Sequence, residues 1–142
     1  MQIKGDDCFM KKIAVIGSNS FSGSYFIDYV LEKTNCDVIG VSRSPEKNDI
    51  FLPYKSKDPN RFTFHQLDLN KDNDRILKLF DKEEPDVIVN FAAQSEVGPS
   101  WKNPEQWFRT NCLSVTITQS EKCGTFTSLG FSKPVPHLPF AL

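Results

Sequence analysis

Residues 12–24 read KIAVIGSNSFSGS, and this stretch decides the fold. Its first five residues form a compact apolar run, typical of a strand that is buried on both faces of a sheet. Gly17 ends the run, and small residues continue to Gly23. Residues 24–33 then carry apolar side chains at helical spacing, at Phe26, Ile27, Val30 and Leu31. A strand, a glycine-containing loop and a helix in this order predict the start of a βαβ unit.

The alternation of strands and helices continues along the chain. Residues 44–60 are polar, hold three prolines and are expected to be mostly loop. Because right-handed crossovers bring the strands into the order 3-2-1-4, the pattern predicts an α/β fold. This fold is an incomplete, Rossmann-like parallel sheet of about four strands with flanking helices. The further expected elements are strands at 37–41, 61–65 and 86–91 and helices at 72–82 and 104–118.

The end of the chain breaks this pattern. Residues 122–142 contain no Asp or Glu, and prolines stand at 134, 136 and 139. Neither helical nor strand periodicity continues there, so we expect no fifth strand. We interpret residues 1–10 as a polar leader, 11–118 as a nucleotide-binding half-domain and 119–142 as an atypical tail. The tail is either an unrelated ending after a truncation or an irregular extension that packs in its own way.

Composition limits the possible functions. The chain has 142 residues, a formal net charge of −1, 39% hydrophobic and 25% charged residues, as expected for a globular domain. Such a charge gives no reason to expect nucleic acid or an anionic membrane as partner. No apolar run approaches the roughly 18 residues of a spanning helix, and the polar leader predicts a cytoplasmic protein. No metal site is expected from the cysteine spacing, with single cysteines at 8, 36, 112 and 123.

The loop from Gly17 to Gly23 has the position of a phosphate-binding loop. A helix N-terminus offers unpaired N–H groups and a positive dipole end to a pyrophosphate, and glycines allow a tight turn and close approach. Ser20 takes the middle glycine position of a G-x-x-G-x-x-G pattern, where its hydroxyl can donate to phosphate. The alternative is an ordinary strand-to-helix turn that uses glycine for backbone reasons.

The end of the second strand bears on the choice of cofactor. An acid at this point favours NAD, because it accepts a hydrogen bond from the ribose 2′-hydroxyl. The sequence reads GVSRS at 40–44 and has no acid there. Arg43 suits a 2′-phosphate, with Ser42 and Ser44 as further donors. We therefore expect NADP or NAD, with NADP favoured; the alternative is a solvated surface arginine.

Two later stretches make the interpretation more specific. Asp68 and Leu69 follow the third strand, and NFAAQSEV follows at 90–97, with Pro104 and Arg109-Thr-Asn111 downstream. Together with the glycine loop, residues 11–117 resemble the extended short-chain dehydrogenases of the NAD-dependent epimerase/dehydratase family. They are most similar to sugar-nucleotide 4,6-dehydratases of the dTDP-glucose or GDP-mannose type. The helix start at Gly23-Ser-Tyr and the missing acid are closer to the GDP-mannose type.

The resemblance implies a role for each matching residue. Those expected at the cofactor pyrophosphate are Gly17, Ser20, Phe21, Ser22 and Gly23. Those expected at the adenosine are Ser42 and Arg43 on the ribose and Asp68 and Leu69 on the adenine. Those expected along the middle and nicotinamide end are Phe91, Ala92, Ala93, Gln94 and Thr110, with Asn111 holding its helix in place. Ser95 is expected near the sugar substrate. The sequence departs from the pattern at Glu96, where many dehydratases have histidine.

The family's catalytic Tyr-x-x-x-Lys pair has one literal match, Tyr29 to Lys33. It lies on the first helix, so we interpret it as coincidental and expect no catalytic residue in this chain. The predicted function is the NAD(P)-binding portion of a nucleotide-sugar 4,6-dehydratase or epimerase, without turnover as it stands. The nucleotide sugar is then a partner of the intact family. The alternatives are a non-catalytic NADP(H)-binding or regulatory module and a misfolding-prone remnant.

Overall fold

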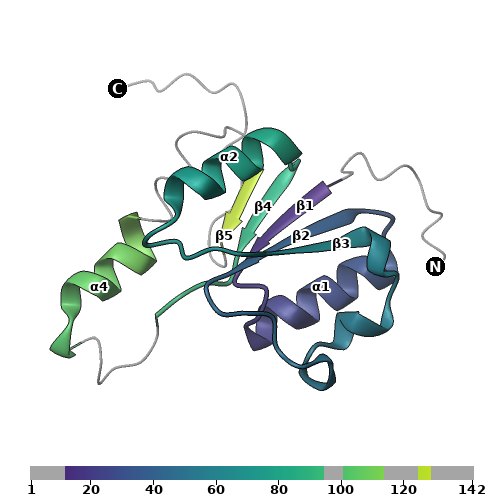
Figure 1. Cartoon of the computed structure of the whole chain (residues 1–142), viewed down its shortest axis with the longest axis horizontal. Coiled ribbons are helices and arrows are strands. Elements are labelled where there is room, and N and C mark those ends of the chain that lie inside the picture. The colour runs from purple at the N-terminus through teal and green to yellow at the C-terminus, as the bar shows by residue number, and fades with distance from the viewer. Residues whose placement is uncertain (1–11, 95–100, 114–124, 129–142) are drawn as a thin grey trace, which may run out of the picture.

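A parallel β-sheet forms the centre of the protein. The computed structural model describes residues 12–94, 101–113 and 125–128. The sheet order is β3-β2-β1-β4-β5, and every neighbouring pair of strands is parallel (Figure 1). The strands are β1 (Lys12–Ile16), β2 (Asp37–Ser42), β3 (Phe62–Gln66), β4 (Val87–Asn90) and β5 (Thr125–Ser128). The predicted α/β class and the order 3-2-1-4 are confirmed.

The fifth strand corrects one expectation. Residues 125–128 pair in parallel with β4, from Val87 opposite Thr125 to Asn90 opposite Ser128. The prediction that no strand follows Asn90 was therefore wrong for this segment. Four residues are too few to show a period against a proline-rich background, but threonine and phenylalanine favour strands. The free N–H and C=O groups along the outer edge of β4 provide the template on which such a short segment pairs.

Two helices cover opposite faces of the sheet, α1 (Phe21–Lys33) and α2 (Asn73–Glu83) (Figure 1). The expected helix at 104–118 is instead a five-residue α4 (Pro104–Phe108) followed by a π-helical turn, η4 (Arg109–Leu113); residues 114–118 lie outside the described residues. The expected loop at 44–60 contains short 3₁₀ turns, at η1 (Asp49–Phe51), η2 (Pro53–Ser56) and the start of η3 (Pro59–Arg61). No helix among the described residues is both long and apolar enough to span a membrane.

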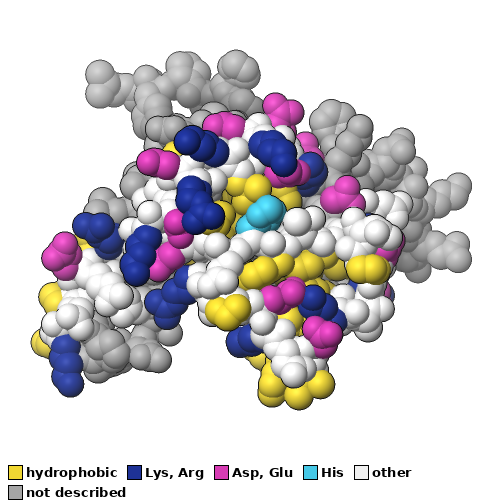
Figure 2. All heavy atoms as spheres, viewed as in Figure 1, with side chains coloured by type: hydrophobic (Ala, Val, Ile, Leu, Met, Phe, Trp, Pro, Cys, Tyr) yellow, Lys and Arg dark blue, Asp and Glu magenta, His cyan; other side chains and the backbone are white. Residues whose placement is uncertain are grey.

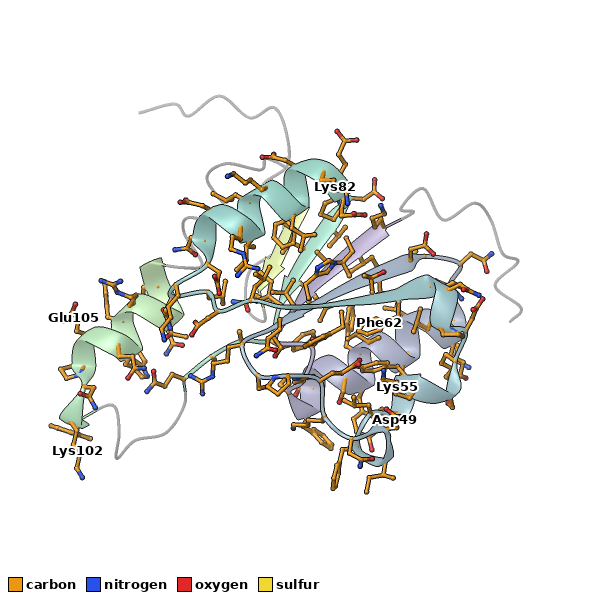
Figure 3. The ribbon with its side chains drawn as sticks, viewed as in Figure 1. Asp49, Lys55, Phe62, Lys82, Lys102 and Glu105 are labelled. Atoms are coloured by element: carbon orange, nitrogen blue, oxygen red, sulfur yellow. The ribbon has the colours of Figure 1, made fainter. Side chains whose placement is uncertain are left out.

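The core on the α1 side follows from strand alternation. Ile13 and Val15 of β1 point to this face and pack with Ile27, Val30 and Leu31 of α1. Figure 3 shows Phe62 and Lys55 on the same side of the sheet, where the Phe62 ring lies 4.5 Å from that of Tyr54, centroid to centroid. Successive strand side chains point to opposite faces, so a continuous apolar run supplies both cores at once.

The core on the α2 side uses the remaining strand positions. Ala14 and Ile16 of β1 pack with Ile76 and Phe80 of α2, and all four are buried. Figure 3 shows the charged Lys82 of α2 away from this contact. The spacing of the α2 apolar residues at i and i+4 gives the helix one buried face, as the sequence predicts. Charged side chains of both signs are interspersed over the face seen in Figure 2.

Candidate functional site

A cleft of about 390 Å³ lies where the carboxyl ends of the first four strands meet. This volume falls in the usual range of small-molecule sites, and in open parallel sheets ligands bind outside these strand ends. Segments after β1, β2, β3 and β4 and the π-helical turn η4 all contribute. The lining residues are Ile16, Gly17, Asn19, Ser20, Val41, Ser42, Arg43, Ser44, Lys47, Leu67, Asp68, Leu69, Asn70, Phe91, Ala92, Ala93, Gln94 and Thr110.

Gly17 occupies a position that only glycine fits without strain. Its φ is +83°, a conformation that residues with a side chain rarely adopt. A Cβ atom at this position would lie 2.6 Å from the backbone nitrogen of Ala92. The backbone after β1 therefore runs directly against the backbone after β4, and this close approach closes the floor of the cleft.

The first turn of α1 leaves donors free beside the cleft. Ser20 caps the helix, and its hydroxyl oxygen accepts a hydrogen bond from the N–H of Gly23 at 3.0 Å. The N–H groups of Phe21 and Ser22 have no acceptor among the described residues. No acidic side chain lies in this turn. The turn therefore offers the unpaired N–H groups and positive dipole end that bind an anion.

The segment after β2 brings positive charge to the cleft. Arg43 and Lys47 both line it, and neither side chain has an ion pair or hydrogen bond with the described part of the chain. Ser42 and Ser44 line the cleft beside them. The N–H of Gly17 donates to the carbonyl of the β2 residue Val41 at 2.7 Å. This bond keeps the ends of β1 and β2 in register below the two cations.

The segment after β3 is fixed by two aspartates. Asp68 Oδ1 accepts from the N–H of Asn70 at 2.9 Å, while the N–H of Asp68 donates to Asp72 Oδ2 at 2.9 Å. The backbone N–H of Asp68, followed by the Arg75 guanidinium, holds the pKa of Asp72 below its usual value. The turn is thereby ordered before any ligand binds, with Asp68 and Leu69 on the cleft wall.

The segment after β4 is shaped by its own side chains. Asn90 Oδ1 accepts from the N–H of Ala92 at 2.8 Å, which turns the chain sharply after the strand. The N–H of Phe91 donates to the carbonyl of Ile16 at 2.7 Å, and the Phe91 ring packs on that of Phe26. Small side chains then follow, so the backbone of Ala92 and Ala93 itself forms the cleft wall.

The turn η4 is bonded to two of these segments. Asn70 Nδ2 donates to Thr110 Oγ1 at 2.9 Å, so the segment after β3 holds the threonine at the cleft. Asn111 hydrogen-bonds the backbone of Gln94 through both its side-chain oxygen and nitrogen. The resemblance implied that Asn111 holds its helix in place, and the structure places it where it does so.

Most of the residues expected to contact a cofactor come together in this cleft. Those among its lining are Gly17, Ser20, Ser42, Arg43, Asp68, Leu69, Phe91, Ala92, Ala93, Gln94 and Thr110. Phe21 and Ser22 lie outside the lining on the exposed first turn of α1, and Gly23 is buried beneath the Gly17 carbonyl. Ser95 and Glu96 lie outside the described residues. The ligand contacts assigned to all of these site residues, including Ser95, remain predictions.

Three polar lining residues were missed, namely Asn19, Lys47 and Asn70, as were three apolar ones at strand ends, Ile16, Val41 and Leu67. Asn19 and Asn70 are adjacent in the sequence to residues that were predicted to line the site. Lys47 lies in a polar stretch without periodicity, and only the return of the chain over the cleft brings it there.

Tyr29 and Lys33 lie on α1 outside the cleft, with Lys33 paired to Glu32 at 2.6 Å. Among the described residues, no group of three His, Cys, Asp or Glu side chains is placed to hold a metal ion.

The strand order and the position of the cleft define a Rossmann-like domain. The chain belongs to the GDP-mannose 4,6-dehydratase family, whose model matches residues 15–118. It is 34% identical over 101 residues to the GDP-mannose 4,6-dehydratase of Yersinia enterocolitica, covering 68% of this chain and 27% of that protein. The resemblance inferred from the motifs is confirmed.

A second dehydratase is similar in sequence, and a solved structure is similar in fold. The dTDP-glucose 4,6-dehydratase of Salmonella typhimurium is 25% identical over 102 residues, covering 72% of this chain and 28% of its own length. The crystal structure of the Bordetella bronchiseptica enzyme WbmH, in complex with NAD+, shares the fold with a TM-score of 0.63 at 24% identity, covering 82% of this chain and 38% of that one. The chain thus spans less than a third of the length of the two dehydratases.

Proposed function

We propose that this chain is the NAD(P)-binding portion of a nucleotide-sugar 4,6-dehydratase. The observation that carries the proposal is the convergence, in one cleft, of a glycine loop with free N–H donors and the segments after β2, β3 and β4. A dinucleotide needs these parts: donors for its pyrophosphate, a polar end for its ribose and a backbone wall without large side chains. Gly17 supports the fit, since a Cβ atom there would fill the space along Ala92.

Each segment has a defined part in this proposal. The first turn of α1 binds the pyrophosphate, Asp68 and Leu69 contact the adenine, and Ala92, Ala93 and Gln94 lie along the middle of the cofactor. Thr110 approaches the nicotinamide end. When bound, the nicotinamide would supply reversible hydride transfer to the whole enzyme. The nucleotide sugar would bind to the whole enzyme, and Ser95 is the residue of this chain expected near it.

We further propose that NADP is preferred over NAD. Arg43 and Lys47 line the end of the cleft proposed for the ribose, neither has an ion pair with the described residues, and the 42–45 segment contains no acid. A guanidinium binds a phosphate through parallel charge-assisted hydrogen bonds, whereas a 2′-hydroxyl offers it no charge. Arg43 is therefore expected to favour a 2′-phosphate.

The test is a thermal-shift titration of the purified chain with NADP+, NAD+ and ADP. A ligand that binds only the folded state raises the melting temperature by mass action. We expect NADP+ to act at a lower concentration than NAD+, and Arg43→Ala to remove this difference. Lys78→Ala is the control, because Lys78 is an exposed cation outside the cleft. A cooperative transition that no nucleotide shifts would contradict the proposal.

One observation favours a second function, a non-catalytic NADP(H)-binding module. The strand β5 pairs along β4, so the described sheet continues on that side within this chain. The chain contains one Tyr-x-x-x-Lys sequence, at Tyr29 and Lys33, and these two residues lie outside the cleft. This candidate predicts cooperative unfolding and cofactor binding without turnover of GDP-mannose or dTDP-glucose. A cofactor-dependent loss of either sugar nucleotide would exclude it.

A further inference from the structure

The side chain of Asn19 links the glycine loop to the segment after β2. It is only 5% exposed, although it lines the cleft. Its Nδ2 group donates to the carbonyl of Pro45 at 2.8 Å, to Ser44 Oγ at 3.0 Å and to the carbonyl of Ser44 at 3.1 Å. Two N–H bonds thus serve three acceptors, and a single buried amide fixes the chain at Ser44 and Pro45.

This attachment lies between the two cations of the cleft. Arg43 precedes Ser44 directly and Lys47 follows Pro45 by two residues, so holding Ser44 and Pro45 restricts where both side chains reach. Without the attachment, an exposed segment of this kind would sample many conformations, and binding a ligand would cost the entropy of ordering it.

The acidic residue of the same segment is engaged elsewhere. Glu46 accepts a hydrogen bond from the Tyr54 hydroxyl at 2.9 Å and pairs with the Lys55 ammonium at 2.7 Å. Burial, reinforced by the Glu46 carboxylate, raises the pKa of Tyr54, which therefore stays protonated and keeps donating. The charge that this segment presents to the cleft is consequently positive, and the acid on the cleft wall is Asp68 of the β3 segment.

We infer that Asn19 is a positioning residue that sets the preference for a phosphorylated ribose, by holding Arg43, the Ser44 hydroxyl and Lys47 around one phosphate monoester. This inference rests on the proposed preference for NADP over NAD. The oxygen of Ser44 already accepts from Asn19, so its own proton is available to a phosphate oxygen. Lys47 adds a second charge that the sequence motif does not include. A 2′-hydroxyl in place of the phosphate has no charge for either cation to balance.

The unused oxygen of Asn19 allows a sharp variant. Asn19 Oδ1 is buried and has no partner among the described residues, so the three observed bonds all depend on the nitrogen. Asn19→Asp keeps the size and this oxygen but replaces the donor with an acceptor facing three oxygens. Asn19→Ala removes the donor without adding a negative charge. Losses that the two variants share report the donor rather than charge or volume.

The experiment measures the dissociation constants of NADP+ and NAD+ by calorimetry for the full chain, the two Asn19 variants and the further variants named below. Asn19→Ala and Lys47→Ala are expected to weaken NADP+ about tenfold, the scale of one charge-assisted hydrogen bond, and to leave NAD+ within about twofold. Asn48→Ala and Lys78→Ala are the matched controls, since both residues are exposed and outside the cleft, and they should change neither constant. Combining Asn19→Ala with Lys47→Ala should cost less than the sum, because both act on one contact.

The outcomes separate the inference from the proposal on which it rests. An unmodified chain that binds NAD+ and NADP+ equally, or neither, would overturn both. A chain that prefers NADP+ but whose Asn19→Ala variant weakens both dinucleotides equally would overturn the inference alone. In that case Asn19 only supports the glycine loop.

If Asn19→Ala fails to fold, Lys47→Ala still tests the inference. If this variant keeps the full preference for NADP+, Lys47 does not contact the phosphate and the inference is wrong.

Discussion

The side chain of Asn111 holds the backbone of Gln94 at two points. Its Oδ1 accepts from the Gln94 N–H at 2.8 Å, and its Nδ2 donates to the Gln94 carbonyl at 3.0 Å. A single amide thereby completes the hydrogen bonding of a residue on the cleft wall. It also fixes η4 against the segment after β4, over a separation of 17 residues.

Replacing Asn111 with alanine should loosen the cleft wall. The variant loses two hydrogen bonds, so we expect the free energy of unfolding in urea to fall by about 1–3 kcal/mol. NADP+ binding should weaken as well, because Ala93 and Gln94 line the cleft. Asn103→Ala is the control on the same segment, since the Asn103 side chain makes no capping bond to α4. Equal losses in the two variants would show that the bonds to Gln94 contribute nothing specific.

Replacing Gly17 with alanine should damage both stability and binding. The positive φ alone costs a residue with a side chain about 1–2 kcal/mol, and the new Cβ would press on the backbone of Ala92. We expect a total loss of roughly 2–4 kcal/mol in urea unfolding, together with loss of NADP+ binding. A Cβ atom at Gly40 would instead meet side chains, lying 2.7 Å from the Phe62 ring and 3.0 Å from Ser18 Cβ, and Gly40 lies outside the cleft lining. Gly40→Ala should therefore destabilise the fold while keeping NADP+ affinity, and equal binding by both variants would contradict this reading of Gly17.

Local patterns were enough to predict the first four strands and the two covering helices. Each is a short run with a clear hydrophobic period, and Gly17 marks the turn between β1 and α1. The start of α1 was expected at residue 24 but lies at Phe21, because Ser20 caps the helix through the N–H of Gly23. The period of the apolar residues does not mark where a helix begins when its first turn is not buried. A serine at the N-cap position does mark the beginning of a helix, so Ser20 could have been used to predict it.

The parts that were not predicted depend on distant contacts. The pairing of β5 requires the free edge of β4, and the bonds of Asn19 and Asn70 join segments separated by 25 and 40 residues. No spacing within one segment encodes such bonds. The site could therefore be predicted as a set of strand-end motifs, but not as the network that positions Ser44, Lys47 and Thr110.

Replacing Arg61 with lysine should destabilise the end of α1. The guanidinium donates to the carbonyls of Leu31 at 3.0 Å, Thr34 at 2.8 Å and Cys36 at 2.6 Å, so one side chain satisfies the turn between α1 and β2. An ammonium group cannot reach three acceptors with the same geometry. We expect a loss of about 1–3 kcal/mol in urea unfolding. Arg75 is exposed and pairs with Asp72, so Arg75→Lys should lower the free energy of unfolding by less than about 0.5 kcal/mol.

The ion pair between Lys12 and Glu83 should make stability depend on pH. The two groups lie 2.9 Å apart and join β1 to the end of α2, and the Lys12 ammonium lowers the pKa of Glu83 from its usual value of 4.5. A lowered folded-state pKa adds stability that is fully present above pH 4.5 and is lost as the pH falls through the folded-state pKa.

Glu83→Gln should therefore be less stable than the unmodified chain at pH 7, by under about 1 kcal/mol for a partly exposed pair. The difference should shrink as the pH falls below 4.5, as urea unfolding at pH 7 and at pH 3 would show. Glu84→Gln removes a neighbouring exposed carboxylate without this ion pair and should give no such difference. A deficit in Glu83→Gln that persists unchanged at pH 3 would mean that the glutamate contributes by packing rather than by charge.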